Sequence, residues 1–394
     1  MTTLSVVIPA YNEEDGIAEI VHRVLQVKER LKISGIDELE LLVVDDGSKD
    51  RTSDIASNIP GARVIQHPVN KGYGAALKTG FSTAKGELIG FLDADGTYPP
   101  EYFPALIDKV HEGYDLVIGS RMAGAASEMP LTRRLGNFFF AGLITVLGRT
   151  RVTDSASGMR VFKREVLEKV SPLPDGLNLT PIMSTRAIHE EVAMTEIPIP
   201  YNERVGRSKL SVVRDGSIYL QSITWTVLTY NPVRIFGLLG LGGMGIAAAV
   251  FLGMVIARLN GITELGPWGV FALFAALVSS VIGISVYSLG VTFNYLVSLF
   301  YKRPIRQGLF GKSILKTPID HHFGWFGASV FTIGLFTAGI SIALSLSGWE
   351  ITRLWFYLLA SALLMMVGMQ MVIYWILLRV LDELSQRDMQ TEHA

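Results

Sequence analysis

Four long apolar stretches in the second half of the chain limit its fold more than any other feature of the sequence. Each is longer than the roughly 20 residues that an α-helix needs to cross a bilayer. A buried helix in a soluble core is the alternative for any one of them, but four such stretches joined by polar connections are typical of a membrane domain. We therefore predict an all-α domain of four transmembrane helices in two hairpins over residues 233–380, followed by a tail at 381–394. The stretches lie at 235–257, 268–292, 324–346 and 354–378.

The charged residues are distributed unevenly along the chain. Residues 1–210 contain 24 basic and 28 acidic side chains, whereas residues 211–394 contain only 11 and 8. The formal net charge of −1 excludes a nucleic-acid-binding protein that depends on bulk positive charge. Cysteine is absent, which excludes disulfides, thiolate nucleophiles and cysteine-ligated metals. We predict a soluble domain over residues 1–210 with no nucleic-acid partner.

The connection between the second and third apolar stretches predicts the orientation in the membrane. It contains five cations and a single acid, Asp320. Loops rich in Lys and Arg remain in the cytoplasm, so four spans place both termini and the soluble domain on that side. Met1–Ser5 leads directly into an apolar strand-like run, so we expect no signal peptide. The five cations are Lys302, Arg303, Arg306, Lys312 and Lys316.

Residues 211–232, between the two halves, have a mixed character. Apolar side chains such as Ile218 and Ile223 alternate there with polar ones such as Arg214 and Gln221. We predict an amphipathic helix that lies in the membrane interface, and a linker helix in solvent is the alternative. The first span that follows is rich in glycine, which permits close packing of helices. Such packing against a second copy of the chain would give a homo-oligomer.

Short apolar runs alternate with helical patterns in the first 120 residues. This alternation predicts an α/β domain with a mostly parallel, Rossmann-like sheet that is covered on both faces. In such sheets ligands bind outside the carboxyl ends of the strands. The expected strands are 4–8, 39–44, 62–65, 88–92 and 116–118, and the expected helices are 16–31, 52–58, 74–84 and 99–113.

Acidic clusters follow the expected carboxyl ends of the strands at 45–46 and 93–95. Asp93 and Asp95 are separated by one residue, so in extended chain both side chains point the same way. Two carboxylates on one side suit Mg²⁺ or Mn²⁺, whose remaining ligands are usually water and phosphate oxygens. A metal ion held in this way can neutralise a diphosphate leaving group.

Four motifs in register resemble the family 2 glycosyltransferases, which have a GT-A fold. They are Val7–Glu14, Val43–Asp50, Asn70–Ala76 and Phe91–Gly96. The resemblance implies a nucleotide-sugar donor and a metal ion on Asp93 and Asp95. The residues implied at the donor are Pro9, Tyr11, Glu13, Val44, Asp46, Asp93, Ala94 and Asp95.

The turn at Lys71, Gly72 and Gly74 leads into an expected helix. Glycine there lets backbone approach a phosphate or ribose, and Lys71 can neutralise charge at the donor. The alternative interpretation is a turn with a structural role alone.

The segments 119–121, 133–137, 152–160 and 204–210 resemble the polyprenyl-phosphate branch of that family, which includes dolichol-phosphate mannose synthases. Archaeal-type members of this branch also carry four C-terminal spans in two pairs. The resemblance implies transfer of a hexose from GDP-mannose or UDP-glucose to a polyprenyl phosphate, dolichyl or undecaprenyl phosphate. An integral protein of a prokaryotic plasma membrane, with its catalytic domain in the cytoplasm, is then expected. One departure concerns Asn137, because the family has a serine at this position.

A lipid phosphate is already anionic near pH 7, since its second pKa is about 6. It needs no general base, but it needs cations beside the anionic donor, and arginine forks match phosphate oxygens. We expect inverting displacement at the anomeric carbon, with Asp93, Asp95, Arg121 and Asp154 as catalytic candidates. Asp154 either orients an arginine or forms a turn. The acceptor-phosphate candidates are Arg121, Arg133, Asn137, Ser157, Arg204, Arg207 and Lys209.

Two other functions fit parts of the sequence. A processive polysaccharide synthase with a membrane channel needs a Gln-x-x-Arg-Trp motif, but Gln221–Trp225 lacks the arginine, and four spans are few for a channel. A non-catalytic membrane scaffold or flippase has no need of the acidic motifs or of the row of arginines.

Overall fold

The computed structural model describes residues 2–124, 129–148, 151–202, 212–262, 266–301, 319–349 and 351–391. The chain divides into two compact units, Met1–Val227 and Leu228–Ala394. The predicted end of the soluble domain, residue 210, lies outside the described residues. The division between the units falls within helix α9, Val212–Tyr230.

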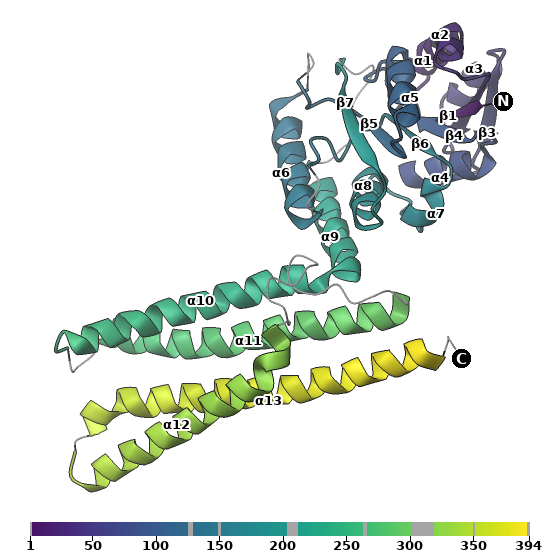
Figure 1. Ribbon diagram of the computed structural model, residues 1–394. Coiled ribbons are helices and arrows are strands. Elements are labelled where there is room, and N and C mark those ends of the chain that lie inside the picture. The colour runs from purple at the N-terminus through teal and green to yellow at the C-terminus, as the bar shows by residue number, and fades with distance from the viewer. Residues whose placement is uncertain are drawn as a thin grey trace. The chain divides into compact units, whose positions relative to one another are not determined.

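The first unit is built on a seven-stranded sheet with the order β3-β2-β1-β4-β6-β5-β7 (Figure 1). Strand β6 runs antiparallel to both of its neighbours, and the other pairings are parallel. The five predicted strands are present, while β6 and β7 were not predicted. The strands are β1 Thr3–Ala10, β2 Glu38–Asp45, β3 Ala62–Gln66, β4 Leu88–Phe91, β5 Leu116–Ser120, β6 Arg160–Lys163 and β7 Met194–Pro198.

Helices cover both faces of this sheet. The alternation of side chains along β1 shows this directly, because Leu4, Val6 and Ile8 enter one core and Val7 enters the other. Helices α1 and α5 pack on the first face, and α4, α7 and α8 pack on the second. The helices are α1 Ile17–Gln26, α2 Lys28–Ile33, α3 Thr52–Ser57, α4 Tyr73–Thr83, η1 Pro100–Tyr102, α5 Phe103–His111, α6 Leu131–Gly148, α7 Val166–Val170 and α8 Leu179–His189.

Glycine brings helix α4 close to the sheet. A Cβ on Gly80 would overlap with the side chain of Val7 on β1, so α4 could not approach this closely with a larger residue. Since α4 begins at the turn after Asn70, this packing also places the 70–72 turn at the carboxyl edge of β1 and β2.

The described part of the second unit contains four long helices, which Figure 1 shows running alongside one another. All four are long and apolar enough to cross a membrane, as the sequence predicts. Helix α13 continues to Thr391, so the expected tail from 381 is largely helical. The helices are α10 Pro232–Leu259, α11 Pro267–Tyr301, α12 Phe323–Leu346 and α13 Ile351–Thr391, with the short helix η2 at Ile319–His322.

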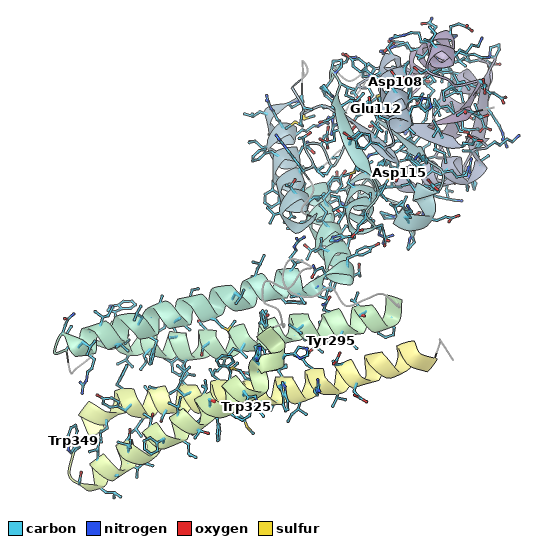
Figure 2. The ribbon with its side chains drawn as sticks, viewed as in Figure 1. Asp108, Glu112, Asp115, Tyr295, Trp325 and Trp349 are labelled. Carbon is cyan, nitrogen blue, oxygen red and sulfur yellow. The ribbon has the colours of Figure 1, made fainter. Side chains whose placement is uncertain are left out.

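Glycine allows close packing within each helical hairpin of this unit. A Cβ on Gly240 of α10 would overlap with backbone at Gly283 of α11, and one on Gly327 of α12 would overlap with Gly368 of α13. At the ends of α12, the exposed tryptophans Trp325 and Trp349 match the interfacial aromatics of membrane helices (Figure 2). The basic loop used to predict orientation, 302–318, lies outside the described residues.

Candidate active site

A cavity of about 660 Å³ lies at the carboxyl ends of β1, β2 and β4. Parallel pairing of these three strands brings their following loops to one edge of the sheet. Helices α4, α6 and α9 and the segment 176–180 contribute further walls, together with residues such as Arg121, Ala156 and Tyr201. Nine of the residues predicted from the sequence border this cavity: Pro9, Tyr11, Glu13, Asp46, Asp93, Asp95, Arg121, Arg133 and Asn137.

Asp46 organises the donor side of the cavity. It is buried, and its carboxylate accepts hydrogen bonds from the backbone N–H groups of Lys71 at 2.9 Å and Gly72 at 2.8 Å. The Nδ1 atom of buried His67 lies 2.7 Å from the same carboxylate, and its Nε2 atom lies 2.9 Å from Thr79 Oγ1. Asp46 therefore fixes the turn before α4 and still borders the cavity.

The glycines of this turn serve a contact within the protein. Gly72 has a φ of +106°, and a Cβ on it would overlap with the carbonyl oxygen of Asp175. A Cβ on Gly74 would overlap with backbone at Pro174. The turn is therefore packed against the 174–176 segment. This contact within the protein accounts for both glycines, as expected if the turn is a plain structural one. The Lys71 side chain is exposed and is not among the residues that border the cavity.

Asp93 and Asp95 follow β4 and both border the cavity. The Tyr73 hydroxyl donates to Asp93 Oδ1 at 2.7 Å, and burial and then the Asp93 charge raise the pKa of Tyr73 well above its usual value. Asp95 Oδ1 accepts from the Thr97 hydroxyl at 2.6 Å. Both carboxylates are thus held by neighbouring hydroxyls, which orients them.

This pair fits the requirement of a small divalent cation. Mg²⁺ and Mn²⁺ bind through one or two carboxylates together with substrate phosphates and water. The described ranges contain no group of three or more His, Cys, Asp or Glu residues that could form a site from protein ligands alone. Asp93 and Asp95 would therefore hold the ion together with a bound diphosphate.

Arg121, just after β5, forms a two-point ion pair with Asp154. Its Nε and Nη2 atoms each donate to the Asp154 carboxylate at 2.7 Å. Burial lowers the pKa of Arg121, but the charge and hydrogen bonds of Asp154, together with Tyr98 and Tyr201, outweigh burial, and the pKa lies well above its usual value. Nη1 makes no hydrogen bond to any of the described residues, and Arg121 borders the cavity. This nitrogen is therefore a candidate donor to an anion.

The partly buried Glu196 and the buried Arg160 hold the segment that carries Asp154. Glu196 of β7 accepts from the backbone N–H groups of Thr153 at 3.0 Å and Asp154 at 3.1 Å. The fully buried Arg160 of β6 donates to the backbone carbonyls of Ser155 at 2.9 Å and Ser157 at 3.2 Å. Burial lowers the pKa of Arg160 to about 10.

Arg133 and Asn137 lie on α6 and border the cavity. Arg133 Nη1 donates to the Tyr201 hydroxyl at 3.2 Å. Asn137 donates through Nδ2 to the Thr153 carbonyl at 3.1 Å, while its buried Oδ1 has no partner among the described residues. Asn137, where the resemblance implies a serine, therefore anchors α6 to the segment before Asp154.

The other predicted residues in the described part of the chain do not border the cavity. Val44, Ala94, Asp154 and Ser157 are buried behind its wall, and Ser157 Oγ donates to the Gly119 carbonyl at 2.6 Å. Arg204, Arg207 and Lys209 lie outside the described residues.

Several aromatic residues of the site were not predicted. Tyr73 lies inside the motif Asn70–Ala76, so the motif itself was a usable signal. Tyr98 follows the Asp93–Asp95 pair closely, but nothing in the sequence relates it to Arg121. Tyr201 and Tyr219 reach the cavity only because β7 and α9 pack beside it.

Comparison with known families defines the class of this fold and site. The sequence model of Glycosyl transferase family 2 matches residues 5–171, and a model described as a domain of unknown function, DUF8752, matches residues 232–392. A mixed α/β sheet with an acid-x-acid pair at the carboxyl end of β4 and this match together define a glycosyltransferase with a GT-A fold.

Individual relatives extend the likeness beyond the matched domain. The chain is 34% identical to the dolichyl-phosphate hexose transferase of Haloferax volcanii over 56% of this chain and 92% of that protein. It is 30% identical to the undecaprenyl-phosphate 4-deoxy-4-formamido-L-arabinose transferase of Edwardsiella ictaluri over 79% of this chain and 94% of that protein. The chain belongs to glycosyltransferase family 2.

Among solved structures, glucosyl-3-phosphoglycerate synthase from Mycobacterium tuberculosis, crystallised with Mn²⁺, UDP and phosphoglyceric acid, resembles the chain with a TM-score of 0.46. The likeness covers 58% of this chain and 78% of that one at 24% identity.

Proposed function

We propose that this glycosyltransferase moves a hexose from a nucleotide-sugar to a polyprenyl phosphate in a membrane and inverts the anomeric centre. The observation that carries the proposal is one cavity bordered by two kinds of charge. Asp93 and Asp95 suit a metal-bound diphosphate, while Arg121 and Arg133 suit a second anion. The names of the two relatives, both transferases for polyprenyl phosphates, support the choice of acceptor.

A lipid acceptor also accounts for apolar side chains on the helices that wall the cavity. Helix α6 turns Arg133 and Asn137 toward the cavity and exposes Leu135 and Phe138, whose exposed fractions are 61% and 72%. Helix α9 likewise exposes Trp225. Exposed apolar surface of this kind is unusual in a soluble domain and is expected where a protein rests on lipid.

The proposed reaction forms one bond and breaks one. An oxygen of the lipid phosphate bonds to the anomeric carbon of the hexose, and the bond from that carbon to the diphosphate oxygen breaks. The electron pair leaves with the nucleoside diphosphate. A Mg²⁺ or Mn²⁺ ion, when bound, neutralises that leaving group.

The protein contributes position and charge. Asp93 and Asp95, held by Tyr73 and Thr97, would orient the diphosphate end of the donor. Arg121 would hold the acceptor phosphate through Nη1, because Asp154 already occupies Nε and Nη2. Since the phosphate is already ionised, Asp154 would act by orienting Arg121 and would remove no proton.

The proposal includes the arrangement in the cell. The catalytic unit and both termini would face the cytoplasm, where nucleotide-sugars are available, and α9 would lie in the interface. The four helices of the second unit would anchor the enzyme, and contacts between copies would give a homo-oligomer.

A product analysis tests this function. Membranes that contain the protein are incubated with Mn²⁺, polyprenyl phosphate and either radiolabelled GDP-mannose or radiolabelled UDP-glucose. We expect a lipid-soluble product that mild acid cleaves to the free sugar, and we expect an Asp95→Ala variant to make none. A polymer of high mass would instead identify a polysaccharide synthase, and no product from any donor would support a non-catalytic scaffold.

A further inference from the structure

Tyr98 borders the cavity and is almost completely buried, with an exposed fraction of 1%. It follows β4 by a few residues, close to the Asp93–Asp95 pair. Its hydroxyl and its ring make separate contacts, and each contact leads to a different charged residue of the site. Neither contact is part of the mechanism described above.

The hydroxyl of Tyr98 supports the carboxylate of Asp93 through Gly158. The backbone N–H of Gly158 donates to the Tyr98 hydroxyl at 2.7 Å. The Cα atom of Gly158 lies so close to Asp93 that a Cβ there would overlap with the carboxylate. The position of Gly158 therefore limits where Asp93 can place its oxygens, and Tyr98 helps to fix that position.

The ring of Tyr98 supports the guanidinium of Arg121. The Arg121 Cζ atom lies 5.5 Å from the centroid of the Tyr98 ring and 5.5 Å from that of the Tyr201 ring. The two rings meet edge to face, with their centroids 6.3 Å apart. A guanidinium at this distance from an aromatic face is attracted to it, and burial strengthens the attraction. The two rings and Asp154 together hold Arg121.

We propose that Tyr98 is a positioning residue that serves both substrates, its hydroxyl through Gly158 and Asp93 and its ring through Arg121. The proposal rests on the proposed function for the identity of the two ligands. It assigns the two tasks to different atoms of one side chain. The tasks can therefore be separated by substitution, because phenylalanine removes the hydroxyl and keeps the ring, whereas leucine removes both.

The test measures two binding affinities on the purified full-length protein in detergent. Mn²⁺ is titrated in the presence of saturating GDP or UDP, whichever the wild type binds, and its dissociation constant is determined by calorimetry. Citronellyl phosphate, a short soluble prenyl phosphate, is titrated separately. Steady-state KM and kcat values and thermal unfolding are recorded for each variant.

We expect Tyr98→Phe to weaken Mn²⁺ binding about threefold to tenfold, the range for a lost hydrogen bond, and to leave citronellyl phosphate binding within twofold of wild type. We expect Tyr98→Leu to weaken Mn²⁺ binding equally and also to weaken citronellyl phosphate binding about threefold to tenfold. Tyr201→Leu should weaken only citronellyl phosphate binding. Tyr102→Phe, a nearby tyrosine that packs against the core, should change neither affinity.

Several results would overturn the proposal. If the Tyr98→Phe protein binds Mn²⁺ with wild-type affinity, the role assigned to the hydroxyl is wrong. If the Tyr98→Leu protein binds citronellyl phosphate with wild-type affinity, the role assigned to the ring is wrong. A drop in unfolding temperature without either change means a purely structural residue. If wild type binds Mn²⁺ and nucleotide but not citronellyl phosphate, the proposed acceptor is wrong and the ring assignment fails with it, while the Mn²⁺ result still decides the hydroxyl assignment.

Discussion

Arg121 and Asp154 are paired through two parallel hydrogen bonds of 2.7 Å, although they are 33 residues apart in the sequence. The Asp154 side chain is fully buried and that of Arg121 is 12% exposed. A pair held in this geometry keeps the guanidinium in one orientation and leaves one nitrogen for a ligand. The pair therefore gives a direct way to test how Arg121 is positioned.

Asp154→Asn should lower both the stability and the use of acceptor. Removing one charge from a buried pair leaves the other charge uncompensated, which lowers the free energy of unfolding by about 3 kcal/mol or more. We expect a lower unfolding temperature and an acceptor KM at least tenfold higher, with little change in donor KM. Thermal unfolding in detergent and steady-state kinetics measure these effects.

The matched control is Asp115→Asn. Asp115 pairs with Lys163 at 2.7 Å, but both side chains are partly exposed. Exposed ion pairs contribute little to stability, so the free energy of unfolding should fall by less than about 1 kcal/mol. The KM values for donor and acceptor should be unchanged. Equal effects of the two substitutions would argue against a special role for the Arg121–Asp154 pair.

Tyr73→Phe should weaken metal binding. The Tyr73 hydroxyl donates to Asp93 Oδ1 at 2.7 Å, and hydrogen bonds to charged groups contribute about 1.5–3 kcal/mol. We expect the Mn²⁺ concentration for half-maximal activity to rise about tenfold, with the acceptor KM unchanged. Titration of activity with Mn²⁺ checks this, and an unchanged Mn²⁺ requirement would show that Asp93 is positioned without Tyr73.

Gly158→Ala should abolish activity in a folded protein. The new Cβ would overlap with the Asp93 carboxylate and displace it from the cavity wall. We expect kcat to fall at least about 100-fold, equivalent to about 2.7 kcal/mol of transition-state stabilisation.

Gly142→Ala in α6 is the comparison, because in the described part of the chain no atom beyond the adjoining turns of its own helix lies within 4 Å of a Cβ there. This change should keep activity and stabilise the helix by up to about 1 kcal/mol. Retained activity in Gly158→Ala would mean that Asp93 tolerates displacement.

Removal of divalent metal should stop sugar transfer. Asp93 and Asp95 carry the charge that we assign to a metal site, and without the ion they would repel the donor diphosphate. We expect EDTA to abolish product formation and either Mn²⁺ or Mg²⁺ to restore it. Full activity after exhaustive chelation, verified by metal analysis, would contradict the assignment of these two aspartates.

Polar substitution of the exposed face of α6 should affect long acceptors selectively. Leu135→Gln together with Phe138→Gln removes apolar surface that we expect to rest on lipid. In proteoliposomes the KM for a long polyprenyl phosphate should rise severalfold, whereas transfer to soluble citronellyl phosphate should be unchanged. A parallel loss with both acceptors would instead indicate damage to the cavity wall that α6 forms.

The local pattern of the sequence was sufficient for the framework of this protein. The four long helices follow from the length of the apolar stretches, because a helix that crosses a bilayer needs about 20 consecutive apolar residues, and such a run can be read directly from the sequence. The positions of Asp46, Asp93 and Asp95 at one edge follow from strand–helix alternation, since parallel strands present their carboxyl ends together.

Contacts between distant segments decided the rest of the site. The short strand β6 enters the sheet in reverse between β4 and β5, and its Arg160 holds the segment that carries Asp154 and Gly158. Glycine at position 72 is required by the contact with the 174–176 segment, and the backbone N–H of Lys71 donates to Asp46 while its side chain is exposed.

The sequence by itself indicated the residues to which we assign the chemistry, because acid-x-acid spacing, apolar length and family motifs are properties of neighbouring residues. Only the tertiary structure decided what holds those residues in place. Tyr98 illustrates the difference, since its proposed role depends on Gly158 and Arg121, which lie just before β6 and just after β5. Packing between distant segments depends on how side chains fill space in the folded core, and it cannot be predicted from the local periodicity of the sequence.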